Sequence, residues 1–82
     1  MKINIDMKED IRRKLEEILP IVDFDSEFLF QELDSLGITT ILMVLSEMYG
    51  IELSHSDVTP RNFKTLDSLV ELVKRKLNKD DD

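Results

Sequence analysis

The 82-residue sequence contains no cysteine and no tryptophan, and it has only two glycines, two prolines and one histidine. A chain without cysteine can form neither a disulfide nor a thiolate metal site, and a single histidine with scattered carboxylates is a poor set for zinc or iron. The core must therefore be purely apolar. The length allows one domain, which we expect to span residues 1–82, with an ordered core at about 6–78 and a flexible acidic tail at 79–82.

Long apolar runs are also missing. No segment approaches the roughly 20 apolar residues that span a bilayer, and the first six residues do not resemble a secretory signal. We therefore expect a soluble, cytoplasmic protein without membrane insertion.

Positive charge is absent from the middle of the chain, where no lysine or arginine occurs between Lys14 and Arg61, and the net charge is −7. Nucleic-acid affinity comes mainly from cationic side chains, so a nucleic acid is not expected as a partner. A monomer that meets partners with basic surfaces fits this charge better. Several acidic residues of the middle region have no cation nearby in the sequence: Glu32, Asp34, Glu47, Glu52 and Asp57.

Apolar residues recur at helical intervals in three segments, residues 7–19, 35–49 and 66–78. Pro20 should end the first helix and Gly50 the second, because proline disfavours helical geometry before it and glycine permits a left-handed closing turn. The sequence predicts an all-α fold, a small four-helix bundle with three main helices, one short helix and a long loop between helices one and two.

Polar residues at the expected helix ends support this assignment. Asp6 and Thr65 are predicted N-caps of the first and last helices, and Thr59-Pro60 should open a short turn at residues 61–64. Residues 51–53 alternate like a strand but have no partner strand, so we expect an extended connector.

The connection at residues 20–34 is long for so small a domain. Its apolar content argues against disorder and predicts that it packs over the core, with a short helical turn near residues 27–30. Its apolar side chains are Ile21, Val22, Phe24, Phe28, Leu29, Phe30 and Leu33.

The candidate site is Ser35, in the quartet Asp34-Ser35-Leu36-Gly37 that opens the second helix. The first N–H groups of a helix lack partners and carry partial positive charge, so Ser35 is suited to carry a phosphodiester. The alternative is that Ser35 only caps the helix. A second Asp-Ser-Leu occurs at residues 67–69, but Ser68 lies within the apolar stripe of the last helix and has no long loop before it, so we interpret it as structural.

The quartet, the helix after it and the later Asp-Val-Thr-Pro-Arg-Asn-Phe at residues 57–63 resemble the acyl carrier protein and peptidyl carrier family, over about residues 7–77. The resemblance implies that a phosphopantetheinyl transferase attaches 4′-phosphopantetheine from coenzyme A to Ser35, and that Asp34 helps this transferase to dock. The thiol of the arm would carry acyl or aminoacyl groups as thioesters to partner enzymes, and the chain itself would not be an enzyme.

The same resemblance implies that Leu36 and Met43 are exposed and contact partner enzymes, together with Glu47. Five residues of the second helix could also form a groove for an attached acyl chain, although ordinary core packing is an alternative for several of them. These residues are Leu36, Ile41, Met43, Val44 and Met48.

The second helix departs from the pattern of fatty-acid carriers, which usually place acids two, five, eleven and twelve residues after the serine. Those positions hold Gly37, Thr40, Ser46 and Glu47, so only the last is acidic. The sequence looks more like the D-alanyl carrier and stand-alone specialised carriers. It leaves the cargo open among an amino acid, an aryl acid and an unusual acyl chain.

Two other functions remain as alternatives. An unmodified acidic adaptor could bind one partner protein through its apolar second helix. A small hydrolase would need a base beside Ser35, and the only histidine, His55, has no evident orienting carboxylate.

Overall fold

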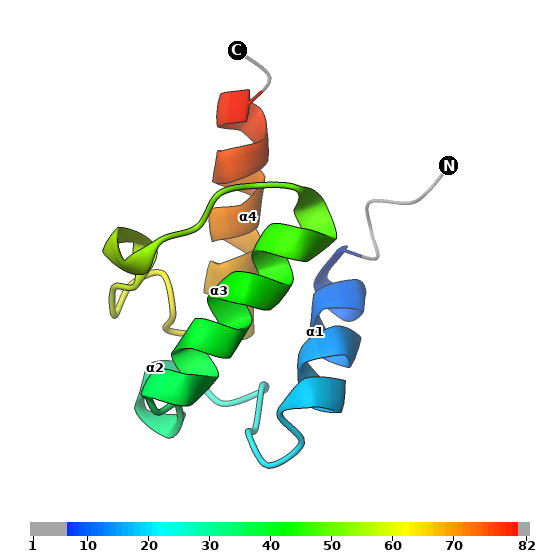
Figure 1. Cartoon of the computed structure of the whole chain (residues 1–82). Helices are drawn as coiled ribbons and strands as arrows, with labels where there is room; N and C mark the ends of the chain where they lie inside the picture. The colour runs from blue at the N-terminus through cyan, green and yellow to red at the C-terminus, as the bar shows by residue number, and fades with distance from the viewer. Residues whose placement is uncertain (1–6, 81–82) are drawn as a thin grey trace.

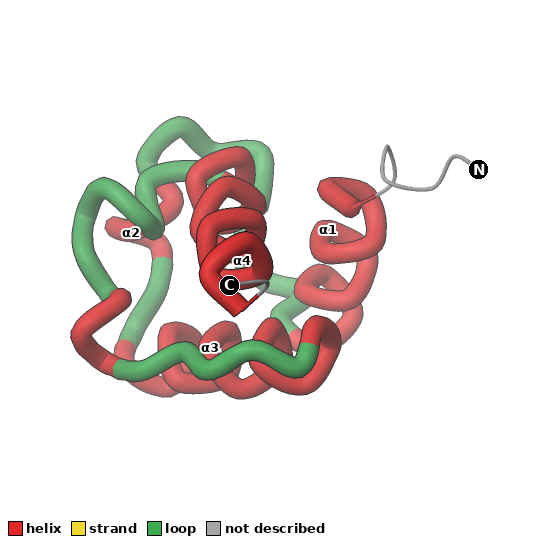
Figure 2. The backbone as a smooth tube through the Cα atoms, turned by 90° about the horizontal axis from the view of Figure 1, so that it is seen from above, coloured by secondary structure: helices red, strands yellow, loops and turns green. Residues whose placement is uncertain are grey.

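A computed structural model describes residues 7–80 of the chain, and within this range every regular element is helical. The elements are α1 (Met7–Ile18), α2 (Leu29–Glu32), α3 (Ser35–Tyr49), the 3₁₀ turn η2 (His55–Asp57) and α4 (Leu66–Asp80). The three long helices pack against one another, with α3 crossing α4 at a slant (Figure 1). Seen from above, the connection after α3 starts on the side of α1, runs back along α3 and then passes to the side of α4 opposite α1 (Figure 2). The prediction of an all-α bundle with one short helix is confirmed.

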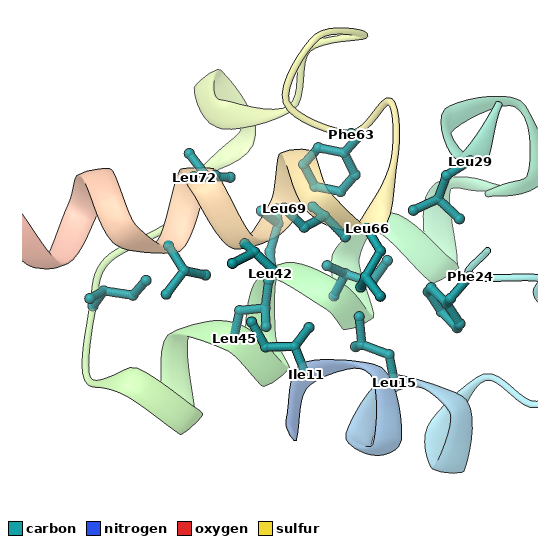
Figure 3. Packing of buried hydrophobic residues seen from close by; sticks show 14 residues of the cluster. Ile11, Leu15, Phe24, Leu29, Leu42, Leu45, Phe63, Leu66, Leu69 and Leu72 are labelled. Carbon is teal, nitrogen blue, oxygen red and sulfur yellow. The ribbon is translucent and has the colours of Figure 1, made fainter. Parts of the chain in front are cut away.

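The core is apolar, as predicted, and no polar or charged side chain is buried among the described residues. Ile11 and Leu15 of α1 meet residues of α3 and α4 at its centre (Figure 3). Phe30 and Phe63 make an edge-on ring contact, with centroids 6.4 Å apart, which joins α2 to the turn before α4. Burial of these side chains is the main stabilising term for a chain with no covalent crosslink.

The ends of α1 and α4 differ slightly from the prediction. Helix α1 ends at Ile18 rather than Leu19, although the Leu19 N–H still donates to the Leu15 carbonyl at 2.7 Å. Helix α4 begins as predicted, since the Thr65 Oγ1 accepts from the Ser68 N–H at 3.1 Å, but it continues to Asp80 instead of ending at residue 78. The predicted cap Asp6 and the tail residues 81–82 lie outside the described residues.

The connection between α1 and α3 packs over the core through Phe24 and Leu29, which are fully buried. The prediction that the connection packs over the core is therefore confirmed, although two of its apolar side chains lie at the surface, Ile21 at 93% exposed and Phe28 at 62% exposed. The short helix of the bundle, α2, begins two residues after the predicted start of a turn at residue 27.

Residues 61–64 form a single turn, as predicted, and not a helix. The turn is closed by the Phe63 N–H, which donates to the Thr59 carbonyl at 3.0 Å, and capped by the Thr59 hydroxyl, which accepts from the Asn62 N–H at 3.0 Å. After the turn, the Lys64 carbonyl accepts from the Leu29 N–H at 2.9 Å, and this bond joins the segment to the start of α2.

Two polar contacts fasten the segment before α4 to the helix itself. Lys76 Nζ lies 3.2 Å from the Asp57 carboxylate, and Arg75 donates to the Asn62 side-chain oxygen at 2.7 Å. The expectation that Asp57 lacks a cation was therefore wrong, because Lys76 lies close to it only in the folded chain.

Arg12 holds the long connection against α1. Its guanidinium pairs with Asp25 of the connection and with Glu9 one turn away on α1. The hydrogen bond that Arg12 donates to the Asp25 carboxylate is the main cause of a raised pKa of Arg12, with further support from the neighbouring negative charges. None of the described helices has both the length and the apolar character needed to cross a bilayer.

Candidate functional site

The start of α3 is set by Asp34. This residue has extended backbone angles, φ −101° and ψ −179°, and its carboxylate Oδ1 accepts a hydrogen bond from the Gly37 N–H at 2.8 Å. Its carbonyl accepts from the Ile38 N–H at 2.9 Å, which is the first intrahelical bond of α3. Asp34 is therefore the N-cap, and the alternative that Ser35 caps the helix is wrong.

Ser35 is the first residue of α3 and is exposed. Within residues 7–80 no group hydrogen-bonds to its hydroxyl, because Asp34 already satisfies the Gly37 N–H that a capping serine would bond. The N–H groups of Ser35 and Leu36 lie in the first turn, where a helix offers no internal acceptor. A phosphodiester on the Ser35 oxygen would meet these donors and the positive end of the helix dipole, so the residues present fit such a group.

Gly37 allows this tight start, which the sequence analysis did not anticipate. A β-carbon at this buried position would lie 3.3 Å from the Asp34 Oδ1 and 3.5 Å from a methyl carbon of Leu33. Any larger residue would press on the capping carboxylate. A glycine inside a helical pattern was the available signal, because it usually has a packing reason.

An open depression of about 430 Å³ lies beside Ser35, between the first connection and the start of α3. We call it the loop groove. Figure 1 shows α2 beside the first turn of α3, at this end of the molecule. The groove is lined by Leu19, Ile21, Val22, Gln31, Glu32, Leu33, Asp34, Leu36 and Gly37.

The residues expected to contact partners lie along the exposed side of α3. Leu36 is 74% exposed and Met43 is 56% exposed, so the expectation of exposure is confirmed for both. Glu47 is also exposed, near the end of the helix. At 1.5 Å of rise per residue, Met43 and Glu47 lie about 12 and 18 Å from Ser35 along the helix axis. Their contact with partners stays a prediction.

The other apolar residues of α3 belong to the core. Ile41 and Leu45 are completely buried, while Val44 and Met48 are half-buried and pack against the buried cluster. Core packing thus accounts for these four residues, and the apolar groove anticipated on α3 is not formed by them. Tyr49 also packs at the edge of the core, and burial, followed by the charge of Asp10, raises the pKa of its phenol.

Ser68, the alternative attachment serine, and His55, the possible base of a hydrolase, both lie in surroundings that differ from those of Ser35. The Ser68 hydroxyl lies 3.1 Å from the Thr65 hydroxyl within the cap of α4, which agrees with a structural role. His55 is exposed on η2, and no hydrogen bond joins it to Ser35 in the described part of the chain. The geometry therefore gives no support to a hydrolase centred on Ser35.

Within residues 7–80, a small helical bundle thus presents a serine hydroxyl without a hydrogen-bond partner at a capped helix start, an arrangement that suits a module bearing its chemistry on an attached group. A family model described as the phosphopantetheine attachment site matches residues 8–75, and the chain belongs to this family. The family carries covalently attached 4′-phosphopantetheine. No curated protein and no solved structure gives a significant match.

Proposed function

We propose that this protein is an acyl carrier that holds acyl or aminoacyl intermediates as thioesters on a phosphopantetheine arm attached to Ser35. The observation that supports this proposal most is the exposed Ser35 hydroxyl, which has no hydrogen-bond partner within residues 7–80 and lies at the N-terminus of α3. The family match includes this position. In this proposal residues 1–82 form a single carrier domain.

Other serines of the described chain are less suitable as attachment points. Ser46 is half-buried within α3, far from a helix start. A hydroxyl that already holds a turn or a cap is a poor nucleophile to present to an enzyme, because its release would break that contact. Four hydroxyls make such hydrogen bonds: those of Ser26, Ser54, Ser56 and Ser68.

Attachment requires a phosphopantetheinyl transferase and coenzyme A. The Ser35 oxygen forms a new bond to the phosphorus of the pantetheine half of coenzyme A while the pyrophosphate bond breaks. Adenosine 3′,5′-bisphosphate leaves with the electron pair of the broken bond, and the hydroxyl proton is lost to a base of the transferase. Asp34 keeps the first turn of α3 in place and helps the transferase to dock. When bound, the arm supplies the thiol that a cysteine-free chain lacks.

The protein body serves as a rigid anionic handle. Tethering keeps the cargo at high effective concentration near each enzyme that the carrier visits. We expect partner enzymes with basic surfaces to contact Leu36, Met43 and Glu47, and we expect the net charge of −7 to oppose self-association. The chain contributes no catalytic group of its own to the chemistry of the cargo.

The test is intact-mass measurement after incubation of the purified protein with a promiscuous phosphopantetheinyl transferase and coenzyme A. We expect one phosphopantetheine addition to the natural sequence, none to Ser35→Ala and one to the matched control Ser68→Ala. If the natural sequence gains no mass, the carrier function is wrong and the unmodified adaptor becomes the better account.

A further inference from the structure

The loop groove contains the two most exposed large apolar side chains of the described residues. Ile21, at 93%, is the most exposed large apolar residue among those described, and Leu36, at 74%, is the next. Both line the same groove, together with the half-buried Leu19, Val22 and Leu33. Exposed apolar side chains that converge on one hollow are typical of a surface that another molecule covers.

The charged residues of this groove are acidic and lack cations. Glu32 and Asp34 line it, and the Glu32 carboxylate also accepts from the Asp23 N–H at 3.3 Å, which joins α2 to the first connection. Neither carboxylate forms an ion pair with a lysine or arginine within residues 7–80, in contrast to Asp25, which Arg12 neutralises. The groove is therefore an apolar hollow with a negative rim.

The exposed side of α3 carries less charge. Between Ser35 and the end of the helix its only acid is Glu47, about 18 Å from Ser35 along the axis. At physiological ionic strength the Debye length is about 8 Å, so Glu47 contributes little to the potential at Ser35. The negative potential around the site comes from the side of the first connection and α2.

We propose that the loop groove is the docking surface for the enzymes that act on Ser35, and that it takes an apolar side chain of the partner flanked by arginine or lysine. This inference rests on the proposed function and specifies its partners. The occupant is a basic protein and not a second copy of this chain, because a second copy would bring the same uncompensated carboxylates against Glu32 and Asp34. Most of the charge that partners recognise then lies beside the helix start, and Glu47, near the end of α3, contributes less.

Kinetics with a promiscuous phosphopantetheinyl transferase test this surface. We expect Ile21→Ser to lower kcat/KM for the addition to Ser35 about tenfold, because an apolar side chain buried at the interface is lost. The matched control is Phe28→Ser, an exposed apolar residue that lines a separate hollow with Pro60 and Lys64. This control should leave kcat/KM unchanged.

A second pair of variants tests the charge. Glu32→Gln keeps an oxygen to accept from the Asp23 N–H but removes the charge, and it should lower kcat/KM about two- to threefold at low salt and not at 0.5 M NaCl. Glu52→Gln, an exposed acid in the connector after α3, is the matched control and should have no effect. An effect of Glu47→Gln equal to or larger than that of Glu32→Gln would overturn the proposal.

Amide chemical shifts locate the contact without any need for the reaction. Ser35→Ala, labelled with ¹⁵N and titrated with the transferase in the absence of coenzyme A, should show its largest shift changes at residues 19–22 and 31–37. Changes centred on residues 43–49, or no changes while the natural sequence still gains mass, would refute the groove alone. A natural sequence that gains no mass would instead refute the proposed function.

Discussion

Replacing Asp34 by alanine should separate the structural part of the site from its chemical part. The Asp34 carboxylate accepts the Gly37 N–H at 2.8 Å and so satisfies one of the unpaired donors at the start of α3. Alanine cannot accept this bond. The neighbouring Ser35 hydroxyl makes no such contact within residues 7–80, so its removal should leave the helix start unchanged.

The expected magnitudes follow from this geometry. Loss of an N-cap side chain costs about 1 kcal/mol, within a range of roughly 0.5–2 kcal/mol, and in a domain of this size 1 kcal/mol corresponds to about 4–8 °C in Tm. Asp34→Asn should cost less, because asparagine keeps an oxygen that can cap the helix. Ser35→Ala should change the free energy of unfolding by less than about 0.5 kcal/mol, as expected for an exposed side chain without a partner.

Urea unfolding followed by circular dichroism at 222 nm measures all three variants on the same scale. We expect the order of stability to be natural sequence and Ser35→Ala, then Asp34→Asn, then Asp34→Ala. A loss for Ser35→Ala as large as that for Asp34→Ala would mean that Ser35 shares the capping role. The argument that its hydroxyl is free for attachment would then be refuted.

Three further predictions concern the bundle. Leu45→Ala should lower the free energy of unfolding by about 2–5 kcal/mol, since this side chain is completely buried; a loss below about 1 kcal/mol in urea unfolding would contradict the packing. Gly50→Ala should cost about 1–2 kcal/mol in the same assay, because residue 50 has φ 61°, and an unchanged midpoint would exclude the left-handed cap. Tyr49, the only tyrosine, should titrate with a pKa above the ordinary value of about 10, which absorbance of the phenolate at 295 nm measures. Its contribution to the free energy of unfolding should be complete below pH 10 and should fall as the pH rises through the raised pKa. An unshifted titration would contradict its burial.

The long helices could be predicted from the sequence because their signals are local. Apolar spacing, Gly50 and Thr65 each act within a few residues, and the structure places the helix ends within two residues of the prediction. Helices α1 and α4 end at Ile18 and Asp80 and not at the predicted Leu19 and Asn78, because hydrogen bonding at a helix end depends on the neighbours of the last turn. Such small shifts do not affect which side chains form the core.

Features that depend on distant residues could not be predicted in the same way. The Lys64 carbonyl bonds to the Leu29 N–H, and Lys76 pairs with Asp57, although neither pair is close in sequence. The exposure of Ile21 is of the same kind, because its position depends on how the whole connection crosses the core. The loop groove was therefore missed by sequence reasoning alone.

The assignment of the cap shows a finer limit. Asp34 and Ser35 are both good capping residues, and the sequence pattern does not decide which one takes the position. The structure gives the cap to Asp34, and the adjacent Gly37 leaves room for its carboxylate. This one-residue difference turns Ser35 from a structural residue into an available hydroxyl.

The most direct test of the account is to locate the modified residue by tandem mass spectrometry, after the natural protein has been incubated with the transferase and coenzyme A and then digested. The account predicts that the added phosphodiester lies on the peptide that contains Ser35 and is absent from the peptide that contains Ser68. Modification at any other residue would contradict it.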